Sequence, residues 1–209
     1  MFRNSAIMTQ AQPLAEQRFM LWIDGVGGYL VCLNSEIVIG QSGPGGAADV
    51  PLQADVSRRH AKITRVENGY VLEPLNGRVT VGGQLVVAER LLAEGDEIVL
   101  GESVKLRFSK PHVLSASARL ELVSGHRTQP FADSVILMAE SCVLGPGWRN
   151  HVTCREWSSD VVLYRSEERL MFRASDSVMI DGKRAEGRAE VAAGSRIVGG
   201  DFSFSLEAV

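Results

Sequence analysis

The sequence lacks long hydrophobic stretches. Its longest apolar runs, which include Phe19–Ile23 and Val135–Ala139, are much shorter than the ~20 residues that a membrane-spanning helix requires. Residues 1–17 also lack the apolar centre of a secretory signal, and we expect them to form a flexible N-terminal tail. These absences predict a cytoplasmic protein without a membrane partner.

Cysteine is scarce as well. The 209 residues include 3 cysteines, an odd number without a regular spacing, which forms no disulfide framework and favours a reducing compartment. His151 and Cys154 form an H-x-x-C pair, but a zinc site needs two further ligands at similar spacing and none lies near. We therefore expect a loop histidine and a half-buried thiol there, and neither a metal nor another cofactor.

An excess of positive charge is also missing. Lys and Arg together number 22 and Asp and Glu number 25, which leaves a net charge of −3. A protein that grips a nucleic-acid backbone is usually basic as a whole or along one stripe. This balance argues against a nucleic-acid partner, although a local basic cluster remains compatible with an anionic ligand.

No long amphipathic helix is apparent, and alternation with a period of two residues dominates instead. Residues 104–108 alternate apolar and basic side chains, and residues 202–206 alternate apolar and hydroxyl side chains, as in strands with one face on a core. The segment Ala185–Ala193 allows at most a turn or two of helix. The 21 glycines fall largely between short apolar runs and mark turns, so the chain is predicted to be all-β. Further strands are expected at Phe19–Ile23, Tyr29–Leu33, Glu36–Ile39, Ala61–Val66, Tyr70–Glu73, Val79–Val81, Ile98–Leu100 and Ala118–Val123.

Length and an internal repeat predict two domains. Val79–Gly83 has a counterpart in Val178–Gly182, and Glu94–Val99 has one in Ala193–Val198, in the same order along the chain. Two domains of roughly 100 residues each also suit the length. We expect two tandem antiparallel β-sandwiches that pack against each other. The predicted boundaries are a tail at 1–17, a first domain at 18–110, a linker at 111–117 and a second domain at 118–209.

One ordered series of motifs occupies Ile39–Gly101. A strand ends at Gly40, and Val56-Ser57-Arg58-Arg59-His60-Ala61 follows after a glycine-rich loop. Asn76-Gly77, a Val-Gly-Gly turn and a Gly-Asp-Glu-Ile strand complete the series. This order resembles the forkhead-associated (FHA) domain, a β-sandwich of the FHA/SMAD-like class that binds phosphothreonine peptides. The second half is identified as a degenerate FHA-like sandwich.

The resemblance implies a role for each matching residue. Ser57 would donate its hydroxyl to the phosphate and Arg58 would add positive charge at the rim of the pocket. Asn76 and Gly77 would form the neighbouring loop, where Asn76 holds the peptide backbone. Read singly, Ser57 is an ordinary turn hydroxyl and Asn76-Gly77 is a turn. The order of the motifs is what favours a site.

Two further residues of the motif would support the site, and a third is expected to play no part in it. Gly40 would allow close backbone packing beneath the site. His60 would be structural, with its ring hydrogen-bonded inside the loops to present Ser57. Arg59 is interpreted as a solvated surface charge. Because a dianionic phosphate needs hydroxyl and guanidinium donors, Ser57 and Arg58 fit the ligand chemically.

The sequence departs from the family pattern at two positions of the first domain. The family's phosphate-gripping arginine corresponds to Gln41, which can donate hydrogen bonds but carries no charge. Arg78 stands where the family has threonine, if the loop is aligned on Asn76, and we hypothesise that Arg78 supplies the missing cation. Aligned backward from the Val-Gly-Gly turn, Gly77 instead takes the asparagine position.

The second domain departs further. Trp157-Ser158-Ser159-Asp160 replaces the Ser-Arg-Arg-His motif, and an aspartate repels phosphate. Trp148 and Trp157 are candidates for interface anchors or for core residues. We expect this domain to bind no phosphate and to contact the first domain or another protein.

These features predict a binding protein. Residues 18–110 are expected to act as a phosphothreonine reader in an adaptor of bacterial-type Ser/Thr kinase signalling, with affinity weakened by Gln41. The partner is then a kinase or its substrate. The alternative is a phosphate-independent scaffold built on FHA folds. An enzyme is not expected, because no nucleotide-binding or nucleophile motif occurs in a suitable setting.

Overall fold

The computed structural model describes residues 18–112 and 114–209, so the predicted tail at 1–17 lies outside the described residues. Within them the chain consists of strands and turns without a helix, which confirms the all-β prediction. The segment Ala185–Ala193 is no exception, because the strand Arg188–Val191 lies inside it and no helix does. Among these residues no helix meets the length and apolarity that crossing a bilayer demands.

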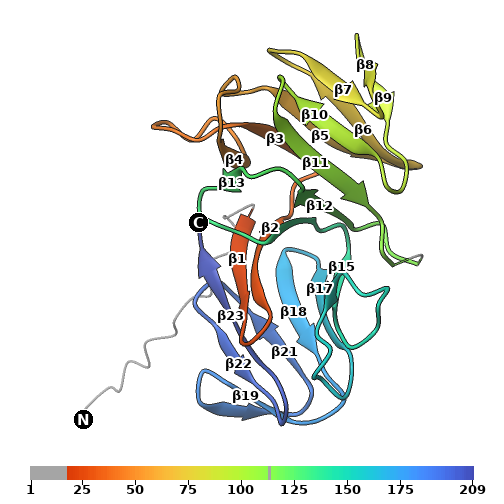
Figure 1. Cartoon of the computed structure of the whole chain (residues 1–209). Coiled ribbons are helices and arrows are strands. Elements are labelled where there is room, and N and C mark those ends of the chain that lie inside the picture. The colour runs from red at the N-terminus through yellow and green to blue at the C-terminus, as the bar shows by residue number, and fades with distance from the viewer. Residues whose placement is uncertain (1–17, 113) are drawn as a thin grey trace.

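Short strands connected by tight turns form both halves of the chain (Figure 1). The strands of the first half are β1 (Arg18–Ile23), β2 (Gly27–Cys32), β3 (Glu36–Gln41), β4 (Val50–Gln53), β5 (Ala61–Val66), β6 (Gly69–Pro74), β7 (Val79–Val81), β8 (Gln84–Leu85), β9 (Arg90–Leu91), β10 (Glu97–Leu100) and β11 (Val104–Ser109). Those of the second half are β12 (Ala118–Leu122), β13 (Arg127–Thr128), β14 (Ser134–Leu137), β15 (Ser141–Gly145), β16 (Val152–Thr153), β17 (Val161–Ser166), β18 (Arg169–Arg173), β19 (Val178–Ile180), β20 (Lys183–Ala185), β21 (Arg188–Val191), β22 (Arg196–Val198) and β23 (Ser203–Ala208).

Three sheets form two sandwiches that share one long sheet. The long sheet has 12 strands in the order β20-β19-β22-β23-β1-β2-β14-β12-β11-β10-β7-β8. A 6-stranded sheet, β13-β4-β3-β5-β6-β9, packs on one end of it, and we call this body the first sandwich. A 5-stranded sheet, β16-β15-β17-β18-β21, packs on the other end and forms the second sandwich.

The first strands of each half lie beside the last strand of the other half. β1 pairs with β23, whereas β12 pairs with β11. Between them β2 and β14 run parallel, with Leu30 opposite Val135. The hairpin β1–β2 therefore extends the second sandwich, and β12 with β14 extends the first, so the two halves have exchanged their opening strands.

Two equivalent arginines mark where the chain leaves the shared sheet. The guanidinium of Arg65 in β5 donates to the carbonyl of Met138, just after β14, at 3.1 Å. The guanidinium of Arg165 in β17 donates to the carbonyl of Leu33, just after β2, at 2.9 Å. Each arginine thus anchors an opening strand from the other half, and the exchange is reciprocal.

The central strands are buried on both faces, which explains their continuous apolar sequences. In β1, Met20 contacts the core of the first sandwich while Phe19 and Leu21 contact the core of the second. In β14, Leu137 contacts the core of the first sandwich and Ile136 contacts the core of the second. A strand with both faces buried is apolar at every position and shows no alternation.

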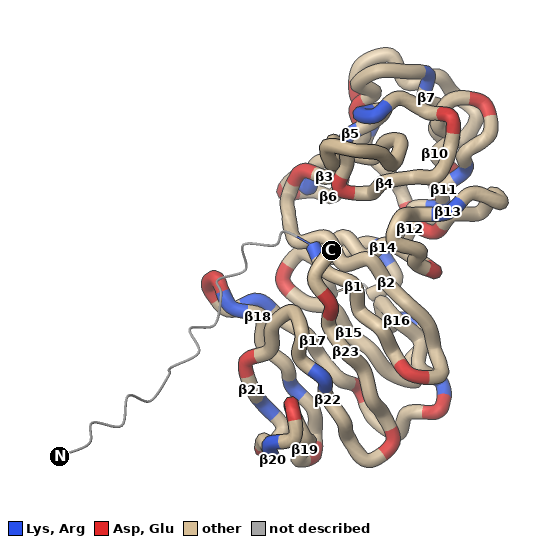
Figure 2. Tube along the Cα trace, turned by 90° about the vertical axis from the view of Figure 1, so that its left-hand side faces the viewer, with Lys and Arg blue, Asp and Glu red and all other residues tan. Residues whose placement is uncertain are grey.

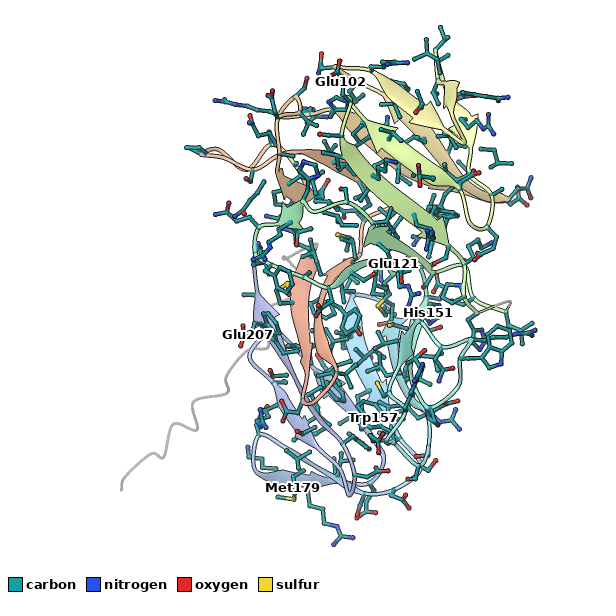
Figure 3. The ribbon with its side chains drawn as sticks, in the orientation of Figure 1. Glu102, Glu121, His151, Trp157, Met179 and Glu207 are labelled. Carbon is teal, nitrogen blue, oxygen red and sulfur yellow. The ribbon has the colours of Figure 1, made fainter. Side chains whose placement is uncertain are left out.

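This arrangement bears on the predicted domains. The division into 18–110, 111–117 and 118–209 stays a prediction. In the structure each sandwich takes strands from both sides of the predicted linker. The loops at the free end of each sandwich point away from the shared strands. Glu102, between β10 and β11, and Met179, in β19, lie at opposite ends of the molecule (Figure 3).

Candidate functional site

The loop between β4 and β5 carries Ser57 at the free end of the first sandwich. Here the backbone of β3 approaches this loop closely, because a Cβ atom at Gly40 would lie 2.1 Å from the carbonyl oxygen of Arg58. The next amide, that of Gln41, donates to the carbonyl of Ser57 at 3.0 Å. Glycine at position 40 therefore lets β3 hold the backbone of the Ser57 loop.

The ring of His60 braces this loop from inside. Ser57 donates its backbone N–H to Nδ1 of His60 at 3.2 Å, so Nδ1 must be an acceptor and Nε2 carries the proton. Nε2 then donates to the carbonyl of Arg78 at 3.0 Å. The imidazole, which is 3% exposed, links the two loops that hold Ser57 and Arg78. This is a structural use of the ring, with both nitrogens occupied.

Gly77 lies against the face of that imidazole. A Cβ atom at this position would lie 2.2 Å from Cε1 of His60, and its φ of 148° is one that side chains rarely adopt. No larger residue fits between the backbone and the ring. If this is the position of the family's asparagine, the chain has replaced a recognition side chain with direct packing on His60.

Asn76 joins the same network through its side chain. Its amide Nδ2 donates to the carbonyl of Arg59 at 3.1 Å. The backbone amide of Asn76 and that of Leu75 both donate to the carbonyl of His60. Asn76 thus connects its own loop to the loop that carries Ser57. Its expected contact with a peptide backbone stays a prediction.

The polar side chains around this network face solvent. Ser57 is half-buried, and Gln41, Arg58, Arg59 and Arg78 are exposed. Lys and Arg positions appear along the loops near β5 and β7 at this end of the molecule (Figure 2). A hydroxyl and several guanidinium groups on loops with a fixed backbone suit an anionic ligand with several acceptor oxygens.

One neighbouring strand could not be foreseen from the sequence. β13 pairs with β4, so that Arg127 lies opposite Gln53 and Thr128 lies opposite Leu52. Leu52 in turn lies opposite Gln41. The exposed Arg127 therefore lies near the edge of the site although it comes from the second half of the chain. A two-residue strand carries no periodic signal, and its partner is distant in sequence.

The second sandwich has different chemistry at the equivalent place. Asn150 donates through Nδ2 to Oδ1 of Asp160 at 2.7 Å, and Asp160 occupies the position of His60. A Cβ atom at Gly145 would lie 2.2 Å from the same oxygen. Trp157 is a core residue at 5% exposed, whereas Trp148 is 77% exposed with Arg149 over its ring. Trp157 is thus a core residue, and a role of Trp148 as an interface anchor stays a prediction.

A family comparison finds a known domain within the first sandwich. The family model of the FHA domain matches residues 37–101. A solved structure described as "Rv0020c_FHA Structure" is similar to the chain at 32% identity, covering 40% of this chain and 84% of that one, with a TM-score of 0.29. No curated protein matches. The matched residues run from β3 to just after β10 and include every residue of the network around His60.

Proposed function

Residues 37–101 make this chain a member of the FHA domain family, whose domains are phosphothreonine-binding interaction modules, and on that premise we propose that the first sandwich reads phosphothreonine in a partner protein. The wider role that follows is that of a non-catalytic adaptor in Ser/Thr kinase signalling. The partner is then a phosphorylated segment of a kinase or of its substrate.

The observation that carries this proposal is the fixed backbone of the Ser57 loop. Three hydrogen bonds hold it: Gln41 N–H to the Ser57 carbonyl, Ser57 N–H to His60, and His60 to the Arg78 carbonyl. A hydroxyl on a loop whose backbone is already fixed binds a phosphate at a lower ordering cost than one on a free loop. Arg58 and Arg78 leave the same two loops as exposed cations.

Gln41 weakens this site in our proposal. Its amide can donate to a phosphate oxygen, but a hydrogen bond between a neutral donor and a charged acceptor lacks the charge-charge attraction that a guanidinium adds. We expect micromolar or weaker affinity for phosphothreonine peptides. Arg78 supplies part of the missing charge, since its carbonyl is fixed by His60 and by the N–H of Gly101 while its side chain remains in solvent.

Isothermal titration of the whole chain against a phosphothreonine peptide library, and against the same peptides without phosphate, tests this function. Binding that requires the phosphate and is lost in Ser57→Ala supports the proposal. Arg78→Ala should weaken binding by roughly tenfold, because it removes one charge-assisted hydrogen bond to the phosphate. Unchanged affinity in Arg78→Ala would exclude Arg78 as the compensating cation.

A phosphate-independent scaffold remains the second candidate, and two observations favour it. Gln41 removes charge from the site, and Trp148 is a large exposed aromatic side chain of the kind that anchors protein interfaces. In that case phosphatase treatment of the partner leaves complex formation unchanged, and Trp148→Ala rather than Ser57→Ala weakens it.

A further inference from the structure

A cavity of about 320 Å³ opens at the loop end of the second sandwich. Three loops line it, namely those that join β16 to β17, β18 to β19 and β22 to β23. By strand order these loops correspond to the ones that carry Ser57, Arg78 and Glu102 in the first sandwich. The lining residues include Ser158, Ser159, Asp176, Ser177, Asp201 and Phe202. The cavity therefore occupies the place of the candidate phosphate site, with different residues around it.

The residues that line this cavity include two carboxylates and neither lysine nor arginine. Arg58 and Arg78 belong to the first site, whereas Asp176 and Asp201 line the cavity. Oδ2 of Asp201 accepts the backbone N–H of Ser158 at 2.5 Å, and hydrogen bonds from Ser158 hold the pKa of Asp201 below its ordinary value. Neither aspartate takes part in an ion pair within the described part of the chain. Their negative charge is thus available to a ligand.

An aromatic group forms another part of the lining. Phe202 is half-buried and packs on Trp157, with ring centroids 5.0 Å apart. The backbone of Gly199 lies against the same ring, because a Cβ atom there would be 2.4 Å from Cε1 of Phe202. The ring is therefore held in place from two sides. A fixed aromatic ring beside carboxylates is a favourable setting for a cation on an alkyl stem.

From these features we infer that the cavity binds a lysine or arginine side chain of a partner peptide. The charged head contacts Asp176 and Asp201, the hydroxyls of Ser159 and Ser177 accept further hydrogen bonds, and the alkyl stem lies along Phe202. Phosphate is disfavoured, because two carboxylates at the rim repel a dianion. This inference does not rest on the proposed function of the first sandwich, whose site lies at the opposite end of the molecule.

Amide NMR of the whole chain provides the test, with acetylated pentapeptides that carry a central lysine, acetyl-lysine or phosphothreonine among glycines. We expect the lysine peptide to shift the amides of Ser158–Ser159 and Gly199–Asp201, with millimolar affinity. Acetyl-lysine removes the charge and should abolish these shifts. Asp176→Asn with Asp201→Asn should weaken lysine binding at least tenfold, while Ser57→Ala leaves it unchanged.

Asp201 also holds a loop, so its replacement can disturb folding. Asp176→Asn alone is the second variant, because Asp176 is exposed at the rim, and it should still weaken lysine binding severalfold. Equal shifts with lysine and acetyl-lysine peptides would overturn the inference. So would shifts of these amides by the phosphothreonine peptide, or an absence of shifts with every peptide. Loss of phosphothreonine binding at the Ser57 loop would instead count against the function of the first sandwich only.

Discussion

At the scale of single residues, the departure at Gln41 has a direct experimental consequence. Position 41 is exposed and adjoins the Ser57 loop, with its backbone amide already bonded to the Ser57 carbonyl. An arginine here has a guanidinium within reach of the same ligand. We expect Gln41→Arg to strengthen phosphothreonine-peptide binding by roughly tenfold to a hundredfold, because a bidentate charged contact replaces a neutral one.

Isothermal titration with matched phosphorylated and unphosphorylated peptides measures this gain. Gln53→Arg, at an exposed position on the neighbouring strand β4, is the control for a nonspecific effect of added charge. If Gln41→Arg and Gln53→Arg raise the affinity equally, position 41 has no special relation to the ligand.

Gly77 makes the second prediction at this scale. A Cβ atom there meets the ring of His60 and the backbone φ is 148°. Gly77→Ala should therefore lower the free energy of unfolding by about 1–3 kcal/mol, because it combines backbone strain with a displaced histidine. Urea denaturation followed by tryptophan fluorescence measures the change. Gly43→Ala is the matched control, since nothing lies within 4 Å of a Cβ atom at that glycine, and its midpoint should stay close to that of the unmodified chain.

At the scale of elements, a strand could be predicted from the sequence when only one of its faces is buried. β11 and β23 have one buried face, so alternation predicted both strands to within two residues at each end. The apolar run at 135–139 overlaps β14, but such a run does not say which strand lies beside it. Pairing between strands more than 100 residues apart, as between β2 and β14, depends on the packing of the whole molecule.

Part of the candidate site could likewise be predicted from the sequence and part could not. The order of motifs was sufficient to select Ser57, Gly40 and His60, because that order is itself a sequence property. The bond from Asn76 to the Arg59 carbonyl, and the position of Arg127 beside β4, arise from loop geometry and from a strand of the other half. Neither has a local signal that a sequence can carry.

The loop that joins β15 to β16 contains a histidine whose burial makes stability depend on pH. His151 accepts the N–H of Val143 at Nδ1 and stacks on His112 at 5.8 Å. Burial first, then the nearby His112 and Arg119, lowers the pKa of His151 from 6.5 to about 4. The unfolded chain therefore takes up a proton near pH 6.5 while the folded chain resists it down to about pH 4. Stability from this group is complete above pH 6.5 and decreases as the pH falls towards 4.

We expect His151→Asn to reduce this loss of stability between pH 7 and pH 4 by up to roughly 3 kcal/mol, since each pKa unit corresponds to about 1.4 kcal/mol. Asparagine keeps an acceptor near Val143 but does not titrate. Urea midpoints at several pH values measure the effect. His126→Asn, at a half-buried position in the turn before β13, is the control and should keep the acid sensitivity of the unmodified chain. Identical pH profiles for the unmodified chain and His151→Asn would contradict the assignment.

At the scale of the whole molecule, the exchange of opening strands predicts that the two sandwiches fold as a single unit. β1 lies between β2 and β23, and β12 lies between β14 and β11, so neither core is complete without strands of the other half. The shared central strands also fix the two loop ends at opposite poles (Figure 3). A phosphothreonine reader at one pole and a cation site at the other would then hold two partner segments apart.

This architecture predicts the behaviour of a chain cut in the linker. A protease site inserted after Leu114, which is 90% exposed, allows cleavage without loss of any strand. We expect the two fragments to stay together in gel filtration and to unfold in one transition, because separating them exposes Phe19, Leu21, Ile136 and other buried residues. Each fragment expressed alone should lack the dispersed NMR spectrum of a packed core, and mixing the two should restore it. Fragments that separate after cleavage, each folded and with its own unfolding transition, would show that each half forms a core with its own strands and that the exchange is not required.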